Sequence, residues 1–162
     1  MNIILVGMPT AGKSTVGVIL AKVLGNQFVD SDLVIQEEEK RLLKDIIAAE
    51  GVDGFLAIEN RVNAQLNVKD SVIATGGSAI YGKEAMKHLK SIGKVVYLKL
   101  NYETIASRLD NAKQRGVTLR EGQTLKDLYE ERCPLYEKYA DVIVDCENSD
   151  IEGVVNKIIG QL

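Results

Sequence analysis

The sequence predicts an α/β fold of three layers, in which a five-stranded parallel sheet carries helices on both faces. Short runs rich in Val and Ile alternate along the chain with longer amphipathic runs, which is the pattern of right-handed β–α–β crossovers. Residues 3–6 and 72–74 are apolar without alternation, as expected for strands buried on both faces. A chain of 162 residues is the size of one domain, so we expect residues 1–162 to share one core.

The elements are expected in a regular order. Strands are expected at residues 2–6, 27–30, 71–75, 94–98 and 141–144, which are rich in β-branched residues. Helices are expected at residues 13–24, 33–50, 53–66, 83–90, 102–109, 125–138 and 151–159. Because ligands of such sheets bind at the carboxyl ends of the strands, functional residues are expected directly after them.

A polar segment, residues 111–123, lies between two of the expected helices and contains two glycines and two arginines. It is close to the expected ligand edge of the sheet. One interpretation is a mobile lid over the active site, and the other is an ordinary surface loop.

The composition excludes several classes of protein. Hydrophobic residues make up 46% and charged residues 27% of the chain, which is typical of a globular protein and not of a disordered one. No apolar run approaches the roughly 18 residues of a membrane helix, and the apolar start is too short for a signal peptide. The net charge of −3 argues against a nucleic-acid partner. Cys133 and Cys146 suggest neither a disulfide framework nor a zinc site, so we expect a cytoplasmic protein. We also expect the protein to be a monomer.

A phosphate-binding loop follows the first expected strand. Residues 7–14 match the pattern G-x-x-x-x-G-K-[ST] between a strand and a helix. The glycines let successive backbone N–H groups face phosphate oxygens, and the helix N-terminus adds a positive partial charge. Lys13 is expected to reach the β- and γ-phosphates, and Ser14 to ligate Mg²⁺. The loop residues expected to bind the nucleotide are Gly7, Thr10, Ala11, Gly12, Lys13, Ser14 and Thr15.

The rest of the sequence narrows the class of P-loop protein. A GTPase would need an N-K-x-D sequence to recognise guanine, and none is present. A motor or transport ATPase has an aspartate with an acidic partner after a strand, whereas residues 75–78 here read Thr-Gly-Gly-Ser. The remaining class is a small-molecule kinase that uses ATP and Mg²⁺.

Two carboxylates follow the second strand. Asp30 and Asp32 are separated by one residue, so in an extended chain their side chains point to the same side. One could hold the water shell of Mg²⁺, and the other could accept a hydrogen bond from an attacking hydroxyl group. The structural alternative is helix capping, since Asp and Ser are favoured at helix N-termini.

Several further segments, in this order, resemble those of the shikimate kinases, and the resemblance extends over nearly the whole chain. These segments are residues 14–17 after the P-loop lysine, 28–32, Phe55 with Glu59, 74–77, 95–98, 131–136 and 140–141. The D-x-D, T-G-G and E-R-x-P-L-Y segments make the resemblance more specific than a P-loop alone. It implies transfer of the γ-phosphate of ATP to the 3-hydroxyl group of shikimate.

The resemblance also implies roles for individual residues. It assigns Asp30 to magnesium, and Asp32 to the hydroxyl groups of shikimate and to proton removal. It assigns Arg132 to the shikimate carboxylate and Arg108 to the adenine. In the lid, it assigns Arg115 to the phosphates. The acceptor pocket would also include Gly76 and Gly77.

The chain departs from the family pattern in three places. Leu56 replaces the arginine of F-R-x-x-E, which makes a second contact to the carboxylate, and Arg120 or a lysine could compensate for it. The lid sequence R-P-L is Arg-Gly-Val at residues 115–117, and Ser78 replaces a third glycine. Two other functions stay open from the sequence: a kinase of the same fold acting on another small hydroxylated acid or polyol, and a nucleotide-binding protein without transfer activity.

Overall fold

The computed structural model describes residues 1–111 and 119–162. Its centre is a five-stranded, all-parallel sheet, in the order β2-β3-β1-β4-β5, which confirms the predicted fold class. The strands are β1 (Asn2–Val6), β2 (Gln27–Asp30), β3 (Ser71–Ala74), β4 (Gly93–Lys99) and β5 (Val142–Asp145). Both ends of every strand lie within one residue of the expected position.

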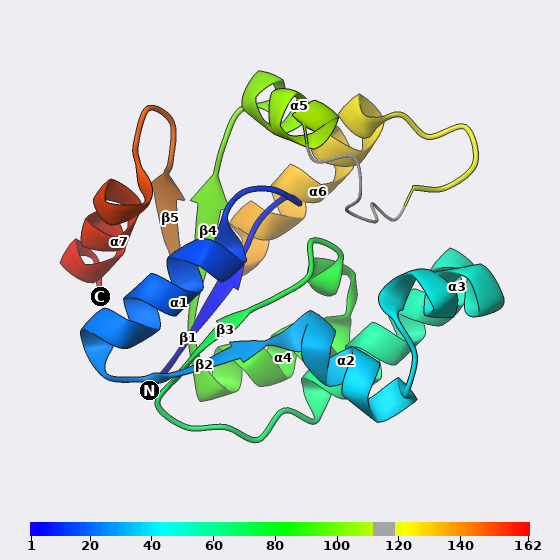
Figure 1. The fold of residues 1–162 in the computed structure, drawn as a ribbon, viewed down its shortest axis with the longest axis horizontal. Coiled ribbons are helices and arrows are strands. Elements are labelled where there is room, and N and C mark those ends of the chain that lie inside the picture. Colours follow the sequence, from blue (N-terminus) through cyan, green and yellow to red (C-terminus); the bar gives the residue numbers. More distant parts are fainter. Residues whose placement is uncertain (112–118) are drawn as a thin grey trace.

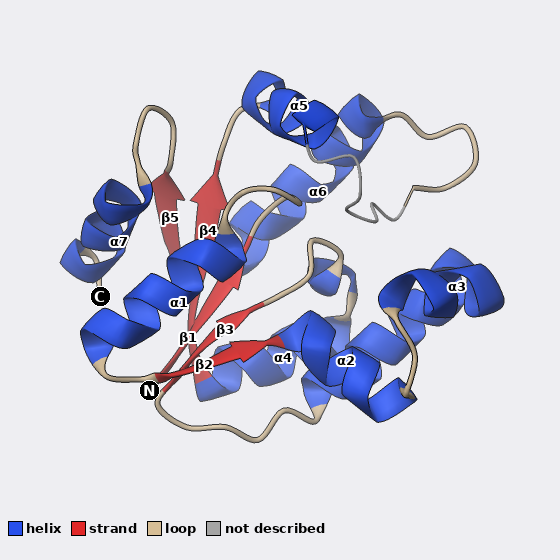
Figure 2. Ribbon diagram, viewed as in Figure 1, coloured by secondary structure: helices blue, strands red, loops and turns tan. Residues whose placement is uncertain are grey.

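The helices surround the sheet. They are α1 (Lys13–Leu24), α2 (Ser31–Glu39), α3 (Leu43–Ala64), α4 (Lys83–Ile92), α5 (Tyr102–Asn111), α6 (Leu125–Tyr139) and α7 (Ile151–Gly160). A short 3₁₀ helix, η1 (Ala79–Tyr81), has no counterpart among the expected elements. Figure 1 shows the order of these elements in space, with α2 and α3 extending beyond the β2 edge of the sheet. In Figure 2, α1 and α7 cover one face of the sheet, and α4 and α6 cover the other.

The sheet forms the main core because its central strands are buried on both faces. All five residues of β1 are buried, and β3 is buried throughout. Apolar side chains of α1, α4, α6 and α7 complete this cluster. A second, smaller cluster joins α2 to α3 through Ile35, Ile46, Phe55 and Val62. Of the described residues, no helix is long and apolar enough to cross a membrane.

The prediction of one continuous helix at residues 33–50 is wrong. α2 ends at Glu39, because Lys40 adopts the left-handed conformation with φ 55°, and α3 begins only at Leu43. The Gln36 side chain accepts a hydrogen bond from the Leu43 N–H at 3.0 Å, so it satisfies a backbone donor at the start of the second helix. Three consecutive glutamates at the C-terminal end of α2 oppose the helix dipole, which favours an end to the helix there.

The helix expected to begin at residue 53 is part of α3. The two halves of α3 meet at Gly51, whose φ of 73° and ψ of 178° are not helical and which kinks the helix. A backbone conformation of this kind is accessible essentially to glycine alone. The kink directs the first turns of α3 and its second half toward different sides of one cavity at the edge of the sheet.

Candidate active site

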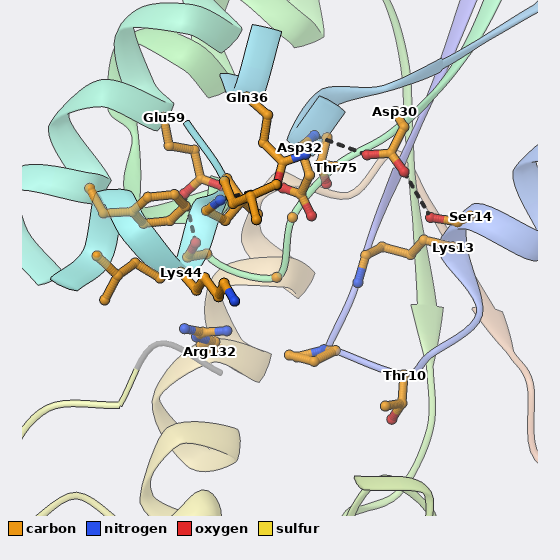
Figure 3. A pocket seen from close by; sticks show the side chains of 18 of the residues that line it. Thr10, Lys13, Ser14, Asp30, Asp32, Gln36, Lys44, Glu59, Thr75 and Arg132 are labelled. Carbon is orange, nitrogen blue, oxygen red and sulfur yellow. Dashed lines mark hydrogen bonds between the residues drawn. The ribbon is translucent and has the colours of Figure 1, made fainter. Parts of the chain in front are cut away.

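A cavity of about 480 Å³ opens at the carboxyl ends of β1, β2 and β3. Its walls come from the P-loop, α2, both halves of α3, the turn after β3, and α6 (Figure 3). The structure places these sequence-predicted residues around it: Thr10, Gly12, Lys13, Ser14, Asp30, Asp32, Gly76, Gly77 and Arg132. Gly7, Ala11, Thr15 and Arg108 do not line the cavity, and Arg115 lies outside the described residues.

The P-loop has the backbone geometry that its glycines predict. Gly12 has φ 96° at the start of α1, and a Cβ at Gly7 would lie 2.9 Å from the carbonyl oxygen of Leu98. Lys13 is 8% exposed, and its Nζ donates hydrogen bonds to the carbonyl oxygens of Gly7 at 2.6 Å and Met8 at 2.9 Å. The lysine therefore lies over the loop, with its ammonium group on the side of the cavity.

The two aspartates reach the cavity in a different way from the one expected. Asp30 is the N-cap of α2, and its Oδ1 accepts a hydrogen bond from the Asp32 N–H at 2.9 Å. Asp32 lies in the first turn of this helix rather than in an extended chain, so the expected i, i+2 alternation is wrong. Both side chains still line the cavity, because the helix begins directly at the carboxyl end of β2. Asp30 therefore both caps α2 and lies close to the P-loop.

Oxygen donors at the P-loop fit a magnesium ion. The Ser14 hydroxyl donates to Asp30 Oδ2 at 3.4 Å, and both residues line the cavity (Figure 3). Within the described part of the chain there is no group of three or more His, Cys, Asp or Glu side chains that could hold a metal by themselves. This donor set suits Mg²⁺, which is usually bound by one or two protein oxygens, substrate phosphates and water.

Glu59 is a buried acid on the acceptor side of the cavity. It is 2% exposed, and its Oε1 accepts a hydrogen bond from the Ser78 hydroxyl at 2.6 Å. Burial, and to a lesser degree the charge of Asp32, raise the pKa of its carboxyl group to about 7, against the opposing effect of the Ser78 hydrogen bond. Among the described residues, its second oxygen has no hydrogen-bond partner.

Gly76 allows this acid to approach the turn after β3. A Cβ at Gly76 would lie 2.8 Å from both Asp32 Oδ1 and Glu59 Oε2. The two carboxyl groups therefore converge on a position that no larger residue could occupy without moving them. Ser78 replaces the family's third glycine, and its hydroxyl group supplies the hydrogen bond to Glu59.

Arg132 places a buried guanidinium group in the cavity wall. It is 2% exposed and lies over the ring of Tyr81, with 5.4 Å between the guanidinium carbon and the ring centroid. Its Nε donates to the Tyr81 hydroxyl at 3.4 Å. Tyr136, one turn further along α6, donates from its hydroxyl group to the Gly77 carbonyl at 2.5 Å. These contacts fasten α6 to the turn after β3.

Two further arginines lie near the cavity. Arg108 of α5 donates to the Thr10 carbonyl oxygen at 2.9 Å, which fixes α5 beside the P-loop. Arg120 donates to Asp53 Oδ1 at 2.7 Å, and both side chains are more than half exposed. Residues 112–118, which hold most of the expected lid and Arg115, lie outside the described residues.

Some cavity residues belong to no motif in the sequence. Lys44 and Gln36 line the cavity, but no pattern singled them out. Lys44 lies in a charged helical stretch that resembles any solvated helix surface, and its direction depends on the kink in α3, which no local pattern indicates. Leu56, the departure from the family pattern, does not line this cavity.

Comparison with known proteins agrees with this arrangement. A family model described as shikimate kinase matches residues 9–162. The chain is 35% identical to a shikimate kinase of Persephonella marina, over 99% of this chain and 98% of the relative, and 41% identical to one of Alteromonas mediterranea, over 99% and 96%.

Solved structures give the same result. The structure of a shikimate kinase from Acinetobacter baumannii in complex with shikimate has a TM-score of 0.89 and 36% sequence identity, covering 99% of this chain and 91% of that one. A shikimate kinase from Aquifex aeolicus has a TM-score of 0.84 and 34% identity, covering 98% and 94%. The chain, with its P-loop and its buried Arg132 around one cavity, belongs to the shikimate kinase family.

Proposed function

We propose that this protein transfers the γ-phosphate of ATP to the 3-hydroxyl group of shikimate, with Mg²⁺ bound at the P-loop. The observation that carries this proposal is one cavity lined by the P-loop Lys13, the carboxylate of Asp32 and the buried guanidinium of Arg132. A phosphate donor and a carboxylate-bearing acceptor would meet there. Family membership over nearly the whole chain supports the choice of shikimate.

The acceptor is positioned by charge at two points. Arg132 binds the shikimate carboxylate, because a guanidinium group matches a carboxylate with paired hydrogen bonds. Gly76 and Gly77 have no side chains, which lets Asp32 and Arg132 lie close to this turn on the acceptor side of the cavity. Asp32 accepts the hydrogen bond of the attacking hydroxyl group and takes its proton as the oxygen–phosphorus bond forms. The bond from the γ-phosphorus to the β–γ bridging oxygen breaks, and ADP leaves with that oxygen.

The donor side neutralises negative charge. Lys13 contacts the β- and γ-phosphates, and the N-terminus of α1 faces them with its backbone N–H groups. Ser14 and Asp30 would hold Mg²⁺, which would neutralise charge on the phosphates. We assign Arg115 to the γ-phosphate and Arg108 to the adenine. The hydrogen bond from Arg108 to Thr10 supports the second assignment, since it places α5 next to the P-loop.

We also propose that the protein acts as a cytoplasmic monomer of one domain. The catalytic groups with assigned roles among the described residues all lie around one cavity of one chain, and no second subunit is required to complete it. Size-exclusion chromatography with light scattering checks the oligomeric state, and a mass near 17.8 kDa is the expected result.

The direct test is ADP release from ATP and Mg²⁺ with and without shikimate. We expect turnover that requires shikimate in the wild type. Lys13→Ala and Asp32→Ala should reduce it by roughly 10²-fold to 10⁴-fold or more, because each removes charge or proton transfer from the transition state. Asp45→Ala is the matched control, since Asp45 is also an aspartate in the first turn of a helix but does not line the cavity.

Two results would contradict parts of the proposal. Near-normal turnover in Asp32→Ala would show that another group accepts the proton. ADP release that shikimate does not increase, in protein that binds ATP, would show that the acceptor is a different molecule.

A further inference from the structure

A second positively charged side chain reaches the acceptor end of the cavity. Lys44 is the second residue of α3 and lines the cavity together with Arg132 of α6. Figure 3 shows the Lys44 and Arg132 side chains in the same part of the cavity, coming from these two helices. The wall that they share would stabilise an anionic group on the acceptor side of the cavity.

Nothing else in the described structure accounts for the direction of Lys44. Among the described residues, its ammonium group makes no ion pair, whereas the neighbouring Arg41 and Arg61 are both paired with glutamates of α2. Lys44 also lies in the first turn of a helix, where a positive charge opposes the helix dipole. Helix stability therefore does not favour a lysine at this position.

The position of Leu56 explains why a second cation is needed. Leu56 stands where the family pattern has an arginine, and it lines a separate, small cavity with Arg120 and Val52. Arg120 is turned toward Asp53, with which it forms an ion pair at 2.7 Å. The sequence left open Arg120 or a lysine as the substitute. The lysine at position 44 lines the acceptor cavity, whereas Arg120 does not.

The opposite side of the cavity is acidic. Asp32 and Glu59 converge on Gly76, on the side away from the two cations (Figure 3). An acceptor with a carboxylate at one end and hydroxyl groups at the other would be oriented by this separation of charge. Its anionic end would lie at Lys44 and Arg132, and its hydroxyl groups at Asp32.

We propose that Lys44 and Arg132 together bind the carboxylate of the acceptor, so that Lys44 supplies the second contact that the sequence lost at Leu56. This inference rests on the proposed function and identifies how the same site recognises its substrate. Lys44 is exposed, so its contribution is electrostatic and sensitive to salt.

The test compares Lys44→Met, Lys44→Arg and the control Lys126→Met. Lys126 is the second residue of α6, is exposed and does not line the cavity, so its loss reproduces the change in charge and helix dipole alone. We expect Lys44→Met to raise the KM for shikimate about tenfold and to leave kcat and the KM for ATP within about twofold. Lys44→Arg should restore the KM, and the effect should shrink at about 1 M salt.

The methyl ester of shikimate lacks the negative charge of the carboxylate, so it tests whether Lys44 acts on that charge. If Lys44 binds that group, Lys44→Met weakens binding of shikimate but not of the ester, as measured by calorimetry. Equal loss for both molecules would overturn the proposal, as would a KM for shikimate unchanged in Lys44→Met. A tenfold rise in Arg120→Met instead would assign the contact to Arg120.

A result that contradicts the proposed function differs from a result that contradicts only the role of Lys44. If the wild type itself neither phosphorylates nor binds shikimate, both the function and the role of Lys44 toward this acceptor are overturned. If the wild type uses shikimate and Lys44→Met behaves like Lys126→Met, the function stands and the inference about Lys44 is overturned alone.

Discussion

Glu59 is an acid whose burial in the site makes the folded protein less stable. Burial is the largest influence on its carboxyl group and raises the pKa to about 7, from an ordinary value of 4.5. The Ser78 hydroxyl, Arg132 and Lys13 oppose this effect, and the charge of Asp32 adds to it. A buried acid that is held next to a second acid is common where a site must accept a polar ligand.

The raised pKa predicts how stability depends on pH. Between pH 4.5 and about 7, the unfolded chain has released the Glu59 proton while the folded chain still holds it, so the free energy of unfolding falls as pH rises. Glu59→Gln removes this dependence. We expect the variant to gain about 2–3 kcal/mol relative to the wild type between pH 5 and pH 8.

Urea denaturation at several pH values measures this difference. Glu130→Gln is the control, because Glu130 is a glutamate of α6 that does not line the cavity. Parallel pH profiles for the wild type and Glu59→Gln would mean that Glu59 titrates as an ordinary exposed acid.

Among the helices and strands, α3 matters most for the site. Its first turn carries Lys44, and its second half carries Phe55 and Glu59, with the kink at Gly51 between them. On a straight helix, residues 44 and 59 would lie about 22 Å apart along the axis. The kinked helix instead contributes both to one cavity. The apolar cluster of Ile35, Ile46, Phe55 and Val62 holds both halves against α2.

We expect Gly51→Ala to disturb this arrangement. A Cβ at Gly51 meets no atom within 4 Å, so the cost is one of backbone conformation, about 1–3 kcal/mol for a non-glycine residue at these angles. The KM for shikimate should rise more than the KM for ATP, because α3 contributes to the acceptor side and the P-loop does not depend on it. Steady-state kinetics and urea denaturation measure both effects.

Gly160→Ala is the matched control for this substitution. Its Cβ also meets no atom within 4 Å, and Gly160 ends α7 without a left-handed backbone. If Gly51→Ala were as stable as the control and kept its KM for shikimate, the kink would not determine the position of Lys44.

Across the molecule as a whole, the strand order brings the site together. Because β1 lies between β3 and β4, and β2 is at the edge beyond β3, the P-loop, the α2 N-terminus and the turn after β3 meet at neighbouring carboxyl ends. Arg132 then reaches this edge from α6, about a hundred residues after Asp30. The main core and the smaller cluster of α2 and α3 together support these groups.

The packing of Val34 against both clusters predicts cooperative unfolding. We expect a single urea transition with coincident midpoints by far-ultraviolet circular dichroism and by tyrosine fluorescence, which is usable because the chain has six tyrosines and no tryptophan. Two separate transitions would mean that the smaller cluster of α2 and α3 unfolds independently of the sheet.

The sheet, the P-loop and the family can all be predicted from the amino-acid sequence. These features are contiguous in the chain: glycines at fixed spacing set the loop from Gly7 to Ser14, and apolar runs without alternation mark β1 and β3. Local backbone preference and burial on two faces are properties of short segments, so a sequence pattern is sufficient to indicate them. Asp30, Asp32 and Arg132 were found in the same way, within short motifs.

The set of side chains that share the acceptor cavity depends instead on how distant segments pack. The break after Glu39, the kink at Gly51 and the rotation of each half of α3 depend on packing against α2 and on the Gln36 cap, which a local pattern does not encode. Those features bring Lys44 to the cavity and leave Leu56 outside it. The direction of a helical side chain changes by about 100° per residue, so it is fixed by the long-range contacts that orient the whole helix.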